Sequence, residues 1–252
     1  LDDMVTASET ATSMGGSQIY LEVGESMSVQ DLLKAIVVAS GNDAATAMAE
    51  HIAGSTEGFV ALMNQKAEEL GMDNTTFVNC HGLDADGHLT TAHDIALMSA
   101  ELLEKHPWIT DYTTIWMDSL RGGAFELANT NKLLRSYTGT TGLKTGSTDL
   151  AKYCLSASAV RGDMQLIAVV MAAPSTAERF KSAAQLLDFG FASVKNLNIS
   201  ENEPLLTGVE TVLIGDQTYQ SSDLSMDDQA VITVPKEASF ADVDSQIMTD
   251  IP

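Results

Sequence analysis

Positive charge is scarce in this sequence of 252 residues, in which 13 lysines and arginines stand against 35 aspartates and glutamates. The net charge of −22 argues against nucleic acid or an anionic membrane as the main partner. Long apolar runs are also missing, and none approaches the roughly 20 residues of a membrane-spanning helix. Cysteine is rare as well: Cys80 and Cys154 permit one disulfide but fit two buried thiols better.

The N-terminus lacks the basic and apolar stretches of a signal peptide, and the chain does not begin with methionine. We therefore expect a mature or truncated piece of a longer protein. Hydrophobic residues make up 44% of the sequence and charged residues 19%, which is ordinary for a globular protein. This length allows one sizeable core, or one core with a small appendage.

Helices are predicted where a capping residue precedes apolar residues at helical spacing. The first begins at Ser28 and stops at residues 40–43, where an alanine-rich second helix starts. Two more begin at Ser55 and Thr91, and residues 108–137 suggest short strands and turns. A last long helix begins at Ser175, and we expect its inward face to carry Phe180, Ala184, Leu187 and Phe191.

The character of the sequence changes after Asn196, since the stretch from Glu201 onward contains 11 acids and a single base, Lys236. Short β-type segments are expected at 208–214 and 229–234. Two such segments cannot close a stable sheet alone. We therefore expect a main domain at 1–196, followed at 197–252 by a linker and part of a small C-terminal β domain.

The segment 140–147 surrounds one lysine with glycines and hydroxyl residues, and an apolar run follows at 153–160. We expect one strand with Lys144-Thr145-Gly146 at its start, then a turn and a second strand at 164–171. A lysine directed into a sheet needs a partner, and Gly146 would let a ligand's backbone lie close to the strand edge. These features suit an extended peptide ending in a carboxylate. Taken alone, the triplet is explained at least as well by a plain turn into a strand.

A second motif, Ser40-Gly41-Asn42, falls at the break between the first two helices. Serine and asparagine are also ordinary capping residues at such a break. The ordered pair of Ser-Gly-Asn and, about a hundred residues later, Lys-Thr-Gly is much rarer than either motif. Penicillin-recognising serine enzymes use Ser-x-x-Lys, Ser-x-Asn and Lys-Thr-Gly, so two of their three motifs are present here in order.

From Leu1 to about Val194 the chain resembles the D-alanyl-D-alanine carboxypeptidases, the low-molecular-mass penicillin-binding proteins. Further stretches that carry the resemblance are 16–21, 39–44, 79–84, 128–134 and 186–191. The resemblance implies an α/β fold of the serine penicillin-binding and β-lactamase type, with an antiparallel sheet flanked by helices and a mainly helical region. It also implies that the N-terminal strands are missing and that the acidic tail starts the family's C-terminal β domain.

The family's first motif is absent, because no lysine of the chain has a serine three residues before it. In the family this motif lies upstream of Ser-x-Asn, and its serine is the acylated nucleophile while its lysine is the general base. We therefore expect it to precede Leu1. These 252 residues alone should be inactive, and a labelled penicillin should not attach to them covalently.

The resemblance implies acyl transfer without a cofactor. The parent protein would cleave the bond between the last two D-alanines of a peptidoglycan stem peptide, hydrolyse the acyl-enzyme, and be inhibited by β-lactam antibiotics. Catalytic roles would fall to Ser40, which relays a proton to the leaving amine, and to Asn42, which holds the substrate amide and the base. Lys144 would supply positive charge that attracts the terminal carboxylate.

The same resemblance implies a substrate-binding set. Thr145 would donate a hydrogen bond to the carboxylate, and the backbone just past Gly146, at Ser147, would donate one oxyanion-hole N–H. Arg179 either binds the carboxylate through its fork or is a solvated arginine that pairs with a nearby acid. Lys132 stands where some relatives carry arginine, and lysine keeps the charge but loses the planar fork.

Histidines and acids between residues 79 and 94 invite a metal interpretation. Their spacing matches neither His-Glu-x-x-His nor a calcium loop, and acidic turns with glycine are common. We therefore expect no metal, and loss of activity on chelation would reverse that view. The residues concerned are His81, Asp84, Asp86, His88, His93 and Asp94.

Two other functions stay open. A β-lactamase of the same fold would deacylate rapidly, in one class with a dedicated glutamate, and no glutamate here lies in a matching loop motif. A non-catalytic wall-binding module would use Ser40 and Lys144 only to hold a peptide. The resemblance to the carboxypeptidases implies a place in the bacterial cell envelope outside the cytoplasm, secreted or on the outer face of the membrane. Membrane attachment, usual in the family through a C-terminal amphipathic helix, would need a segment outside this sequence.

Overall fold

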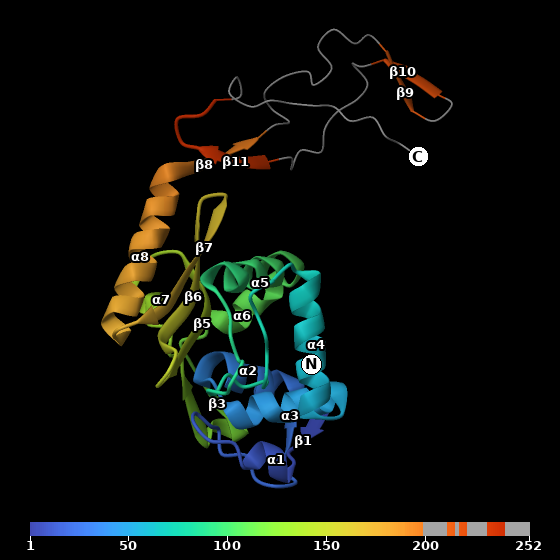
Figure 1. Ribbon diagram of the computed structural model, residues 1–252, viewed down its shortest axis with the longest axis vertical. Coiled ribbons are helices and arrows are strands. Elements are labelled where there is room, and N and C mark those ends of the chain that lie inside the picture. Colours follow the sequence, from blue (N-terminus) through green and yellow to red (C-terminus); the bar gives the residue numbers. More distant parts are fainter. Residues whose placement is uncertain (199–210, 215–216, 221–230, 240–252) are drawn as a thin grey trace. The chain divides into compact units, whose positions relative to one another are not determined.

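The computed structural model describes residues 1–198, 211–214, 217–220 and 231–239 (Figure 1). The chain forms two compact units, the first made of Leu1–Arg161 and Gln165–Leu187 and the second of Gly162–Met164 and Asp188–Pro252. This division falls inside the last long helix, so the domain boundary expected at residue 196 stays a prediction. Among the described residues, no helix is both long enough and apolar enough to cross a bilayer.

The helices and strands of the first unit come mostly in groups, and β7 and α8 each extend into residues of the second unit. Their bounds are β1 Met4–Thr6, α1 Glu9–Thr12, β2 Ser26–Ser28, α2 Val29–Ala39, α3 Asn42–Ala53, α4 Thr56–Glu69, α5 Ala92–Lys105, α6 Thr110–Thr113, β3 Met117–Leu120, β4 Phe125–Ala128, α7 Leu133–Ser136, β5 Thr140–Thr148, β6 Lys152–Arg161, β7 Met164–Ala173 and α8 Thr176–Ser193. Short 3₁₀ turns at Pro107–Ile109 and Arg121–Gly123 join some of them.

The predicted helix starts are confirmed by their caps. The hydroxyls of Ser28, Ser55 and Thr91 each accept a hydrogen bond from the backbone N–H three residues later. Such caps satisfy N–H groups that have no partner within the helix. The helices are therefore fixed at their first residues by the side chains that the sequence places there.

One prediction about the Lys-Thr-Gly region is wrong: the triplet and the run 153–160 do not share a strand. The triplet lies well inside β5, and the run forms β6, which pairs antiparallel with β5 so that Lys144 faces Ser156. A turn separates them, because the Thr148 hydroxyl accepts a hydrogen bond from the Ala151 N–H and Lys152 adopts a φ of 57°. The strands order as β5-β6-β7, which leaves β5 at an edge.

Apolar cores formed by described residues support these elements, and two of them bear on the site. The larger joins the loop before β2 to α2, α3 and the β3–β4 hairpin, and its most buried members include Ile19, Leu32, Val38, Ala44 and Leu127. The smaller joins α2 and α5 to β5 through Val37, Leu103, Ile109, Tyr112 and Leu143. Because α2 contributes to both, its C-terminal end is held close to β5.

The inward face of α8 differs from the expected one. Its buried residues are Arg179, Ala183 and Leu187, whereas Phe180, Ala184 and Phe191 are only partly buried. The buried face therefore begins at Arg179 instead of the predicted Phe180. An arginine can be buried here because carbonyls of β5 and β6 accept hydrogen bonds from its guanidinium.

In the second unit, β8 Val194–Asn198 pairs antiparallel with β11 Val231–Pro235. In the same unit β9 Thr211–Ile214 pairs antiparallel with β10 Gln217–Gln220. The two predicted β segments thus correspond to β9 and β11 where they are described, and residues 208–210 and 229–230 lie outside the described residues. The strands β8 and β10 were not predicted from the sequence. Cys80 and Cys154 are both free thiols and only partly buried.

Candidate active site

The break between α2 and α3 is sharp. Ser40 ends α2 in the left-handed conformation, with φ 61° and ψ 36°, and Gly41 precedes the first residue of α3. A residue other than glycine is uncommon there and is strained. The Ser40 N–H bonds back to the Ala35 carbonyl, so the last turn of α2 fixes the direction of the serine.

Ser40 and Lys144 meet although 104 residues separate them in sequence. The Lys144 ammonium donates to Ser40 Oγ at 2.9 Å and to the Thr145 carbonyl at 2.9 Å. Burial lowers the pKa of Lys144 to about 8, and the positive charge of Arg179 adds to the shift. At neutral pH the ammonium is mostly charged, but it titrates close enough to neutrality to respond to a ligand's charge.

Asn42 is buried at the start of α3 and lies two residues from Ser40. Its side-chain amide donates to the Gly15 carbonyl at 2.8 Å, and its backbone N–H donates to the Ser17 carbonyl. A Cβ on Gly16 would lie 2.7 Å from the amide nitrogen, so glycine at 16 leaves room for it. The structure thus holds Asn42 against the segment 15–17 rather than directly against Lys144.

Thr145 and Gly146 offer different surfaces on β5. The Thr145 hydroxyl is hydrogen-bonded to the Thr130 hydroxyl, and Thr145 is buried. Gly146 and Ser147 are exposed, and no atom lies within 4 Å of the position of a Cβ on Gly146. The strand edge is therefore open where the sequence predicts that a substrate backbone lies.

Arg179 is not the solvated arginine of the second interpretation, since its exposed fraction is 6%. One guanidinium nitrogen donates to the carbonyls of Gly146 and Cys154, at 3.0 and 3.2 Å. The guanidinium also lies over the rings of Tyr153 and Phe180. Arg179 thus joins α8 to β5 and β6 beside the Lys-Thr-Gly triplet, while its buried Nε has no hydrogen-bond partner among the described residues.

Comparison with known proteins agrees with this geometry. The family model of the D-alanyl-D-alanine carboxypeptidases matches residues 1–175. The chain belongs to this family. D-alanyl-D-alanine carboxypeptidase DacF of Bacillus subtilis is 49% identical over 215 residues, which cover 84% of this chain and 54% of DacF. The chain therefore spans about half the length of the curated relatives it matches.

Solved structures of the family superpose well on the chain. Penicillin binding protein 5 from Haemophilus influenzae matches with a TM-score of 0.79 and 31% identity, covering 94% of this chain and 69% of that one. Penicillin-binding protein D2 from Listeria monocytogenes, in its ampicillin-bound form, matches with a TM-score of 0.67 and 35% identity, covering 75% and 77%. The expected α/β fold is thereby confirmed.

Lys132 has fewer contacts than the other site residues that the sequence predicts. It precedes α7 and is exposed, and its backbone carbonyl accepts a hydrogen bond from the Ser136 hydroxyl. Within the described residues its side chain forms no hydrogen bond or ion pair. The neighbouring Asn131 is fully buried and donates to the Gly142 carbonyl at 3.1 Å.

Several residues that support the site were not predicted from the sequence. Asp43 accepts hydrogen bonds from the N–H groups of Ile19 and Leu21 and so fixes the segment before β2 against α3. Thr130 and Asn131 hold β5, as described above. They lie within stretches that resemble the family, but nothing in the sequence shows which side chains cross to another element.

Three of the histidine and acidic residues at 79–94, namely Asp84, His88 and Asp94, hold local structure through hydrogen bonds. Asp84 accepts from the Thr148 hydroxyl at 2.6 Å and from the Leu150 N–H, and so holds the turn between β5 and β6. Asp94 is buried and accepts from the Thr75 hydroxyl, which is the main cause of its lowered pKa. No cluster of three metal-binding side chains occurs in the part of the chain that the structure describes.

Proposed function

We propose that these residues carry the substrate-binding and proton-transfer groups of a serine-type D-Ala-D-Ala carboxypeptidase, whose nucleophile lies outside this sequence. The observation that supports the proposal most strongly is the 2.9 Å hydrogen bond from the Lys144 ammonium to Ser40 Oγ. It joins the second and third family motifs across two elements distant in sequence. Family membership supports the reaction type, and the absence of Ser-x-x-Lys explains why the chain alone should not turn over substrate.

Each residue has a role that its surroundings favour. Ser40 both donates and accepts hydrogen bonds, so it can pass a proton between the leaving amine and a base. Lys144 attracts the terminal carboxylate, and Thr145 donates to it once its hydroxyl turns from Thr130. The open edge of β5 at Gly146 pairs with the extended peptide, and the Ser147 N–H contributes to the oxyanion hole.

Arg179 would support binding of the peptide carboxylate in two ways. It adds positive charge beside Lys144, and it holds β5 in place by donating to the Gly146 carbonyl. Asn42 would orient the substrate amide from the start of α3. Lys132, exposed before α7, would contribute charge at longer range.

The proposed partners are a peptidoglycan stem peptide ending in D-Ala-D-Ala and, as inhibitors, β-lactams such as the ampicillin bound by the Listeria relative. Peptidoglycan as substrate places the protein outside the cytoplasm, in the cell envelope. Membrane attachment through a C-terminal segment is part of the same proposal. The net charge of −22 gives no support to a nucleic-acid partner.

Non-covalent binding tests the proposal on the chain itself. The chain is titrated with an N-acylated peptide ending in D-Ala-D-Ala while its amide chemical shifts are measured. The shifts of β5 and of residues 40–42 should change saturably, whereas the L-Ala-L-Ala peptide should not change them. Lys144→Met should weaken binding by about tenfold or more, because a charge-assisted contact is lost. Lys66→Met, on exposed α4, is the matched control and should bind normally. Equal binding of both peptides, or unchanged affinity in Lys144→Met, would contradict the proposal.

A further inference from the structure

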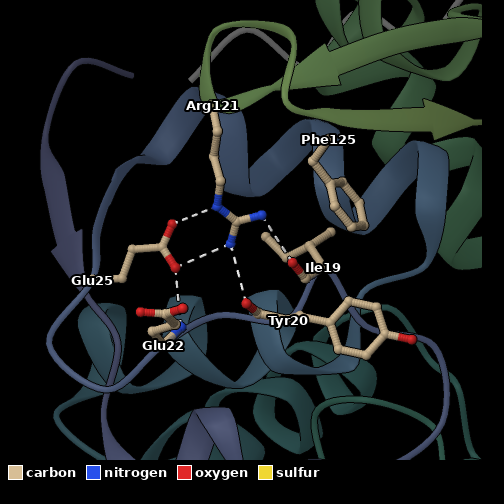
Figure 2. A pocket seen from close by; sticks show the side chains of 6 residues that line it. All are labelled: Ile19, Tyr20, Glu22, Glu25, Arg121 and Phe125. Carbon is tan, nitrogen blue, oxygen red and sulfur yellow. Dashed lines mark hydrogen bonds and ion pairs between the residues drawn. The ribbon is translucent and has the colours of Figure 1, made fainter.

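A separate cavity lies between the segment before β2 and the β3–β4 hairpin. Its volume is about 410 Å³, and six residues line it: Ile19, Tyr20, Glu22, Glu25, Arg121 and Phe125 (Figure 2). Cavities of about 300–1,000 Å³ are typical of small-molecule sites. None of the carboxypeptidase roles proposed above uses these residues.

Two of the lining residues have strained backbones. Tyr20 has a φ of 57° and Arg121 a φ of 54°, a region that side chains other than glycine rarely adopt. The two are linked, because the Arg121 guanidinium donates to the carbonyls of Ile19 and Tyr20, at 3.0 and 3.3 Å. Strain of this kind persists where surrounding contacts enforce it and is concentrated at binding sites.

Charge in the cavity is unbalanced toward negative. Arg121 forms a two-point ion pair with Glu25, at 2.7 and 3.0 Å, and this pair lowers the pKa of Glu25. The charge of the arginine is therefore already compensated. Glu22 is exposed, and within the described part of the chain its carboxylate forms no hydrogen bond or ion pair. An anionic ligand would meet a surplus carboxylate, whereas a cation would find one available.

Aromatic rings form the other wall. Figure 2 shows the carboxylates of Glu22 and Glu25 on one side and the rings of Tyr20 and Phe125 on the other. The two rings pack edge to face at 6.3 Å, and Tyr20 is 70% exposed. The Arg121 guanidinium already lies over the partly buried Phe125 ring, at 5.6 Å, so the face of the Tyr20 ring is the one left to attract an ammonium group or cover an aliphatic chain. Carboxylates opposite aromatic rings thus suit a ligand with a cationic end and an apolar body.

We propose that this cavity binds a primary ammonium carried on an unbranched aliphatic stem, such as a lysine-type side chain. The ammonium bonds to the Glu22 carboxylate and to Glu25 Oε1, because Glu25 Oε2 already accepts from Arg121 and from the Glu22 backbone N–H. The methylene groups lie against Tyr20. This site is independent of the proposed carboxypeptidase activity.

The test uses n-pentylammonium as probe, with 1-pentanol and 1-pentanesulfonate as neutral and anionic controls of the same length. Amide shifts of the isotope-labelled chain are followed during titration. The ammonium should shift resonances of residues 19–25 and 121–125 saturably, in the millimolar range. Glu22→Gln should weaken binding by about tenfold, as expected for loss of a charge-assisted hydrogen bond, and Tyr20→Ala should weaken it to a smaller extent.

Glu57→Gln, which removes an exposed acid on α4, is the matched control and should bind like the parent chain. Glu22 and Tyr20 are exposed, so the spectra of their variants should otherwise be unchanged, which separates lost binding from lost folding. Three results would overturn the proposal: no saturable shift with the ammonium, equal binding of pentanol or pentanesulfonate, or affinity in Glu22→Gln within about twofold of the parent.

Discussion

At the scale of single residues, Lys144 lies between two oxygen acceptors, Ser40 Oγ and the Thr145 carbonyl, with Arg179 near enough to disfavour its charge. A charged lysine in this setting binds a carboxylate well, because neither acceptor is itself an anion. Ligand binding should therefore depend on the protonation of this one group.

The pH dependence follows from the pKa of Lys144, which is about 8. Below this pH the ammonium is charged and attracts the peptide carboxylate, and above it the charge is lost. Affinity for the D-Ala-D-Ala peptide should therefore fall as pH rises through about 8, with the midpoint moved upward by the bound carboxylate. Titrations at several pH values would show this. A profile that stays flat to pH 10, or a Lys144→Met variant with the same profile, would contradict it.

Arg179 should matter for stability as well. Arg179→Met leaves the carbonyls of Gly146 and Cys154 without this donor and removes the stacking on Tyr153 and Phe180. We expect a loss of about 2–4 kcal/mol in the free energy of unfolding by urea. Lys181→Met, on an exposed position of the same helix, should change it by less than about 0.5 kcal/mol. Similar values for the two variants would mean that the arginine is not structural.

Sequence reasoning identified the chemistry-bearing residues better than their contacts. Ser40 and Lys144 were predictable because two ordered motifs are rare together. The burial of Arg179 was not, because a helical pattern is read from apolar residues and an arginine is normally assigned to the solvent face. Likewise, the bonds of Thr130 to Thr145 and of Asp84 to Thr148 depend on tertiary pairing, which one sequence does not show.

At the scale of elements, β5 is a strand with one constrained glycine and one unobstructed glycine. A Cβ on Gly142, whose φ is 144°, would lie 2.7 Å from the Thr113 side chain. A Cβ on Gly146 would meet nothing within 4 Å. The sequence predicted the strand but merged it with β6, since the turn at 149–151 is short, contains the apolar Leu150 and Ala151, and is held by Asp84 from a distant loop.

The two glycines should therefore respond differently to substitution. Gly142→Ala should destabilise the chain by about 2 kcal/mol or more, through overpacking and backbone strain. Gly146→Ala should alter stability by less than about 0.5 kcal/mol, yet weaken peptide binding by about tenfold, because its methyl group occupies the edge that the ligand approaches. Urea unfolding and peptide titration of both variants would decide. Normal binding by Gly146→Ala would show that the ligand does not lie along β5.

At the scale of the whole molecule, the family and the α/β class were predictable from motif order, and the comparisons confirm both. The domain boundary expected at residue 196 stays a prediction, and the boundary between the two compact units falls within α8, which has no break in its helical pattern. The acidic composition beyond residue 200 predicted a linker and part of a second domain, but it could not predict which strands pair. The missing nucleophile motif remains the feature that most constrains function.

Attachment of a fluorescent penicillin, located by mass spectrometry, tests the central claim most directly. The 252 residues alone should remain unlabelled. Joined at Leu1 to a family segment that carries a Ser-x-x-Lys motif, the chain should be acylated on the serine of that motif, and Lys144→Met should strongly reduce the labelling. Covalent label on a serine within these 252 residues, or labelling of the joined chain that does not depend on Lys144, would contradict the account.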